Sequence, residues 1–61
     1  MANLTDAELA SVREALQAEK RLIEKCKSFA NLTDDPTVRG LCEQIAAQHQ
    51  THYDTIFGVL S

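Results

Sequence analysis

A single cluster of turn-forming residues, Asn31 to Pro36, divides the chain into two long stretches whose apolar residues recur at helical spacing. Pro36 is the only proline among 61 residues, and the two glycines, Gly40 and Gly58, both lie in the second stretch. A chain that is interrupted once in this way predicts two helices that fold back on each other. We therefore expect an all-α fold, an antiparallel two-helix hairpin, in which residues 1–61 form a single domain.

The first helix is predicted to span about residues 7–30. Thr5 and Glu8 have the spacing of a capping box, in which each side chain accepts a hydrogen bond from the backbone amide of the other. The apolar residues that follow are separated by three or four positions or by the sum of the two, and they are Leu9, Val12, Leu16, Ile23, Cys26 and Ala30. They define one apolar stripe along the helix.

The second helix is predicted to span about residues 36–59, after a turn at 31–35. Asp35 suits the N-cap position, and Pro36 suits the first helical position, where its missing amide is harmless. The stripe expected to face the first helix consists of Val38, Leu41, Ile45, His52, Ile56 and either Val59 or Leu60. His49 falls within the same sector.

One hairpin buries a single seam between its helices, so the outward apolar residues need another surface. We therefore expect a homodimer in which two hairpins complete a four-helix bundle. Nine acidic and six basic residues give a net charge of −3, which argues against a nucleic-acid partner. No apolar run approaches the roughly 20 residues of a membrane span, and residues 1–6 do not resemble a signal peptide.

Three polar residues, Glu19, His49 and His52, project onto the predicted seam. If residues equidistant from the turn face each other, Glu19 lies opposite His49, and His52 is one helical turn further along. One carboxylate and two imidazoles are a ligand set for a divalent transition metal such as Fe, Zn or Mn. The same residues also suit a hydrogen-bonded polar layer that fixes the register and holds no cofactor. Both interpretations remain open at this point.

The remaining reactive and aromatic residues favour structural roles. Cys26 and Cys42 also lie opposite each other in this register, and we interpret them as small buried apolar residues with reduced thiols. Phe29, Tyr53 and Phe57 are expected to pack in the core or at an interface. No base-activated nucleophile or phosphate-binding loop is evident, which predicts a protein that is not an enzyme.

A set of motifs along nearly the whole chain is shared with one known family. The set comprises LTDAEL at 4–9, Glu19 followed by KRLI at 20–23, Phe29-Ala30, Asp35-Pro36, Leu41 and, most specifically, HQTHYDTI at 49–56. In these motifs the chain resembles the spore coat F family of endospore-forming bacteria, which is regarded as a short ferritin-like or rubrerythrin-like helical unit. The resemblance implies a spore coat protein that is made in the mother-cell cytoplasm and assembles with other coat proteins.

The wider ferritin-like pattern has a Glu on one helix and Glu-x-x-His on the next. By resemblance, Glu19 corresponds to the first Glu and His52 to the His, whereas His49 replaces the second Glu. The lost carboxylate disfavours a di-iron oxidase. Our leading hypothesis is a structural coat-type homodimer, and the alternatives are a ferritin-like metal-binding protein with redox activity and a generic helical adaptor.

Overall fold

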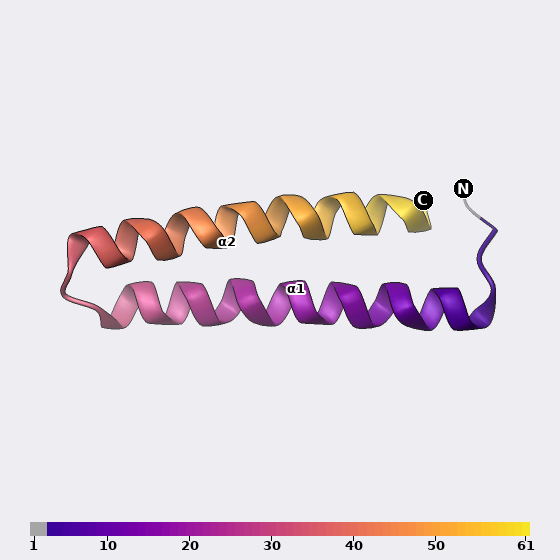
Figure 1. The fold of residues 1–61 in the computed structure, drawn as a ribbon, viewed down its shortest axis with the longest axis horizontal. Coiled ribbons are helices and arrows are strands. Elements are labelled where there is room, and N and C mark those ends of the chain that lie inside the picture. Colours follow the sequence, from indigo (N-terminus) through magenta and orange to yellow (C-terminus); the bar gives the residue numbers. More distant parts are fainter. Residues whose placement is uncertain (1–2) are drawn as a thin grey trace.

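The chain forms an elongated antiparallel hairpin in the computed structural model, which describes residues 3–61 (Figure 1). Helix α1 spans Asp6–Leu32, helix α2 spans Pro36–Phe57, and a short 3₁₀ helix, η1, spans Gly58–Leu60 at the end of α2. The principal extents of the hairpin are 46 × 15 × 10 Å. The part of the chain that is described contains helices and no strands, so the predicted all-α hairpin is confirmed.

Both helices begin at the predicted capping residues. The Thr5 hydroxyl accepts a hydrogen bond from the Glu8 amide at 3.1 Å, and the Glu8 carboxylate accepts one from the Thr5 amide at 3.0 Å. The Thr5 backbone amide, followed by its hydroxyl, holds the pKa of the Glu8 carboxyl below its ordinary value of 4.5. At the start of α2, Asp35 accepts hydrogen bonds from the amides of Thr37 and Val38 at 2.9 and 3.4 Å. Each cap satisfies amides that the helix itself leaves free.

The connection between the helices is shorter than the predicted turn. Helix α1 continues through Leu32, so only residues 33–35 lie between the two helices. Arg39, in the second turn of α2, donates from Nε to the Ala30 carbonyl at 3.3 Å and from Nη2 to the Thr33 carbonyl at 2.9 Å. This cation satisfies carbonyls at the end of α1 that a C-terminal glycine would otherwise help to cap. The sequence pattern alone did not single out Arg39.

The core is a narrow seam between α1 and α2. Its buried residues from α1 are Leu16, Ile23 and Ala30, which lie seven positions apart, and Ala46 is the buried residue of α2. A spacing of seven places a side chain on the same face of a helix after about two turns, as in a coiled coil. The predicted apolar stripe of the first helix is thus the face that packs against α2.

The stripe that α2 turns toward α1 differs from the predicted one. Two of the predicted residues, Leu41 and Ile45, are exposed, and the His52 side chain is also open to solvent. Of the alternatives Val59 and Leu60, Leu60 is the half-buried one and Val59 is exposed. The residues of α2 and η1 that are buried or half-buried are Val38, Cys42, Ala46, His49, Tyr53, Ile56 and Leu60. The second helix is apolar on two adjacent sectors, and the sector that contains the small Ala46 faces α1. This packing leaves the larger side chains of Leu41 and Ile45 exposed to solvent.

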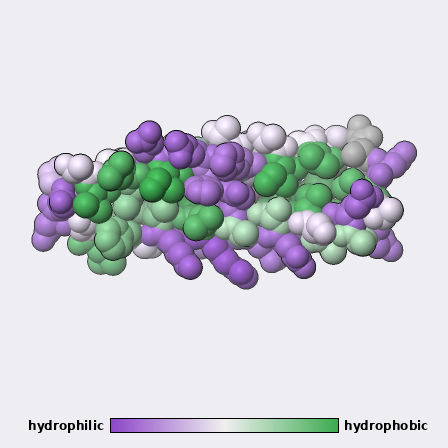
Figure 2. Space-filling model, viewed as in Figure 1, coloured by the Kyte–Doolittle hydropathy of each residue, from purple (hydrophilic) through white to green (hydrophobic). Residues whose placement is uncertain are grey.

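All but one of the large apolar side chains that are exposed in the described residues gather on one side of the hairpin. In an antiparallel pair of helices, a residue that immediately precedes a seam position lies on one side of the pair, and this is the same side for both helices. We call this side the apolar face, and we define it by Leu22, Phe29, Leu32, Leu41, Ile45 and Val59. Figure 2 shows it as green areas toward both ends of the molecule, with hydrophilic residues between them. No helix among residues 3–61 combines the length and apolar character needed to cross a membrane.

Candidate metal centre

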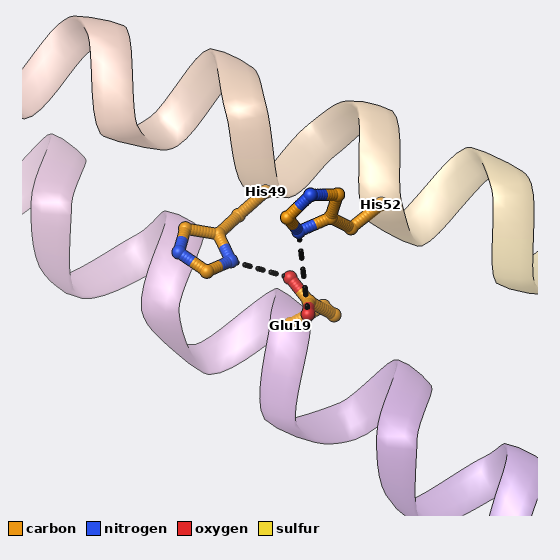
Figure 3. Close-up of side chains that lie close together, drawn as sticks. All are labelled: Glu19, His49 and His52. Atoms are coloured by element: carbon orange, nitrogen blue, oxygen red, sulfur yellow. Dashed lines mark hydrogen bonds and ion pairs between the residues drawn. The ribbon is translucent and has the colours of Figure 1, made fainter.

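Glu19, His49 and His52 come together at mid-length in the hairpin, as the sequence predicts (Figure 3). His49 Nδ1 and Glu19 Oε2 lie at a hydrogen-bonding distance of 2.5 Å. His52 Nδ1 lies 3.8 Å from the other carboxylate oxygen, Oε1. One potential ligand atom from each of the three residues lies within 4.8 Å of the other two. Two residues of α2 therefore converge on a single carboxylate of α1.

The register of the hairpin explains this convergence. Glu19 and His49 lie at matching distances from the turn, and each is half-buried at the seam between the helices. His52 follows His49 by three positions, which makes the two imidazoles neighbours on the surface of α2. Their ring centroids are 5.3 Å apart, with an angle of 88° between the ring planes. The predicted pairing of Glu19 with His49 is confirmed.

The cluster is more open than a fully buried layer. The exposed fractions of the side chains are 18% for Glu19, 24% for His49 and 59% for His52. No polar residue among 3–61 is fully buried in the single chain; Glu19 and His49 lie at the predicted seam, whereas His52 is exposed. The rotation of α2 is the reason, because it places His49 at the seam and His52 beside the apolar face. The cluster is therefore closed toward the helices and open on that side.

The donor set fits a divalent transition metal. Two imidazoles and one carboxylate bind catalytic zinc in some enzymes and non-haem iron(II) in others, and both arrangements leave open coordination positions. Ligand atoms at about 2.0–2.2 Å from an ion lie about 3.3–3.6 Å from one another in a tetrahedral site. The separations of 2.5 and 3.8 Å bracket that range. The limit of 4.8 Å for the whole set lies above that range, so binding of one ion would draw the three side chains closer together.

The same contacts also support a purely structural role. A carboxylate hydrogen-bonded to an imidazole across a helix–helix seam favours one register over its neighbours, because a shift of one helix would leave both groups without partners. Among the described residues, no buried side-chain nitrogen or oxygen lacks a hydrogen-bond partner. Glu19 and His49 are thus satisfied by each other without an ion.

The other residues that the sequence singled out lie away from this cluster. Cys26 and Cys42 are half-buried, less than the predicted full burial, and no disulfide joins them. Tyr53 and Phe57 stack with ring centroids 6.2 Å apart, whereas Phe29 is exposed on the apolar face. Phe57 is exposed as well, on the opposite side of the hairpin.

Comparison with known proteins adds no relative to this description. Neither a protein-family model, nor a curated protein, nor a solved structure matches the chain.

Proposed function

We propose that this chain is a structural protein of the spore coat type, which acts by helical packing and assembly and not by catalysis. The observation that carries the proposal is the apolar face. Seven large apolar side chains are exposed in the described structure, and all of them except Phe57 belong to that face. Exposed apolar side chains that gather on one face are typical of a protein–protein interaction site.

The charged residues support the same division of the surface. The opposite side of the hairpin carries Arg13, Lys20, Glu24, Lys27, Glu43 and Asp54. The helix positions of the apolar side carry fewer charges, Glu8 and Lys25, and Arg21 and Glu24 border Phe29 and Leu32. One side is thus suited to solvent and the other to a protein surface. We base the proposed location, the spore coat after synthesis in the mother cell, on one resemblance. The HQTHYD segment and the other motifs of the chain resemble the coat F family.

Two matched lysine substitutions test this function. Phe29 on the apolar face and Phe57 on the opposite face have exposed fractions of 54% and 52%, so Phe29→Lys and Phe57→Lys place the same charge at equally exposed positions. Each variant is expressed with an epitope tag in an endospore-forming host, and purified spores are fractionated into coat and core. We expect the parent chain and Phe57→Lys in the coat extract and Phe29→Lys largely absent from it. Equal coat incorporation of both variants, or a parent chain confined to the vegetative cytoplasm, would refute the proposal.

Metal binding is a second candidate function, and the convergence of Glu19, His49 and His52 favours it. It is tested by metal analysis of protein that is purified without a chelator. We expect Fe, Zn or Mn in the parent chain and its loss in both Glu19→Ala and His52→Ala, because each substitution removes one of only three ligands. Metal that persists in both variants, or a parent chain that binds none, would argue for the structural layer.

A further inference from the structure

The hairpin exposes more surface than a compact monomer of its size. Its accessible area is 4688 Å², whereas a globular monomer of 6.8 kDa exposes about 4,000 Å². The excess, roughly 700 Å², is close to the 800 Å² or so that each partner buries in a protein–protein interface of standard size. The excess accessible area of the whole chain is therefore about what one partner covers in an interface of standard size.

The distribution of polar and apolar residues along this face suits a second copy of the same chain. Leu22, Phe29 and Ile45 lie on the turn side of the Glu19–His49–His52 cluster, and Val59 lies on its other side. In a symmetric dimer the same patch meets itself. Two orientations of the two-fold axis suit this face, one parallel to the long axis of the hairpin and one perpendicular to it at mid-length. In both, the apolar residues of one chain contact apolar residues of the other, and the two Glu19–His49–His52 clusters lie opposite each other. Any other perpendicular axis would cover the clusters with aliphatic side chains.

We propose that a second copy of this chain occupies the apolar face, and that the two Glu19–His49–His52 clusters share one divalent transition-metal ion across the interface. The proposal of a dimer rests on the assembly function proposed above. The shared ion adds metal binding to that function. His52 is the residue that links the two ideas, because its side chain is 59% exposed beside the face that the partner would cover.

The chemistry of burial supports the shared ion. Covering a polar imidazole with an apolar surface is costly unless the imidazole gains a new partner. At the level of the cluster, the partner chain offers its own carboxylate and two imidazoles. Two chains together supply six donor groups, which matches octahedral coordination, and a divalent ion neutralises the two carboxylates. One ion per two chains is therefore the expected stoichiometry, in contrast to one ion in each separate hairpin.

Analytical ultracentrifugation of the full chain, with and without Co²⁺ as a spectroscopically visible ion, tests this proposal. We expect a dimer that Co²⁺ tightens by at least about tenfold, at one ion per two chains. Phe57→Lys should behave as the parent chain does. Phe29→Lys and Leu41→Lys, on the two helices of the apolar face, should be monomeric. His52→Ala should dimerise without responding to Co²⁺.

The outcomes separate this inference from the assembly function. A parent chain that stays monomeric at all concentrations, with and without Co²⁺, overturns the second copy as the occupant. A dimer that binds one ion per chain, or whose affinity Co²⁺ leaves unchanged, overturns the shared site and leaves the spore-coat test unaffected. Phe29→Lys could lose its helicity together with the dimer while Phe57→Lys keeps both. This result supports the proposal, because it shows that the helices fold only when the two chains associate. Equal weakening by both substitutions contradicts it.

Discussion

The Glu19–His49 pair allows a quantitative test of how the seam is stabilised. We consider replacement of each residue by leucine, singly and together, in the absence of metal. Glu19→Leu leaves His49 without its acceptor, but the imidazole is 24% exposed and water reaches it, so the cost is about 1 kcal/mol. His49→Leu leaves a carboxylate that is 18% exposed, and we expect a larger loss of about 1–2 kcal/mol.

The double variant should behave differently from the sum of its parts. Replacing both members of a buried polar pair by apolar groups is often neutral or stabilising, so Glu19→Leu with His49→Leu should unfold within about 0.5 kcal/mol of the parent chain. The coupling free energy is then about 2–3 kcal/mol, at the upper end of the range for residues in contact. Each kcal/mol corresponds to a shift in Tm of about 4–8 °C for a domain of this size.

Thermal and urea unfolding, followed by circular dichroism at one fixed chain concentration, measures the four free energies. The fixed concentration is needed because dimerisation would add to the apparent stability. A double variant that loses the full sum of the two single losses would refute the reasoning, because the residues would then contribute independently. A metal arm completes the experiment. An ion at 100 times its Kd stabilises the folded parent by about 2.7 kcal/mol, and neither single variant should gain as much.

Three further predictions concern the backbone and the caps. Gly40→Ala should raise the free energy of unfolding by up to about 1 kcal/mol, since a Cβ at this helical position meets open space, and urea unfolding measures it. Arg39→Met should cost about 1 kcal/mol and speed hydrogen exchange at the end of α1, because two carbonyls lose their donor. The lowered pKa of Glu8 means that its stabilising contribution is complete above about pH 4.5 and is lost as the pH falls through the folded-state pKa. In acid titrations of stability, Glu8→Gln should therefore approach the parent as the pH falls, and a difference that stays constant with pH would contradict this.

Much of the fold follows from local signals in the sequence. Thr5 with Glu8, and Asp35 with Pro36, specify where each helix begins, because these residues satisfy the first amides of a helix in a way that few other residues can. The end of α1 was less predictable. It lies at Leu32, where the Thr33 amide donates to the Phe29 carbonyl and Arg39, seven residues beyond Leu32 and in another helix, donates to the Ala30 carbonyl. A cap that depends on a distant residue has no local signature.

The candidate site was predictable in its members but not in its degree of burial. The antiparallel register follows from one short turn, and this register alone places Glu19 opposite His49. The orientation of His52 depends on which sector of α2 faces α1. Because Leu41 and Ile45 occupy one apolar sector and Ala46 the adjacent one, periodicity could not distinguish between the two.

The sequence by itself therefore determined a hairpin of two capped helices and the meeting of one carboxylate with two imidazoles near its middle. Hydrogen bonds close in the sequence, and the length of a single turn, are sufficient for both. Only the tertiary structure decided how far α2 is rotated about its axis. The helices pack with the small Ala46 at the seam, and this packing moves Leu41, Ile45 and His52 to the outside. An exposed apolar face, onto which the Glu19–His49–His52 cluster opens, is the consequence of that rotation.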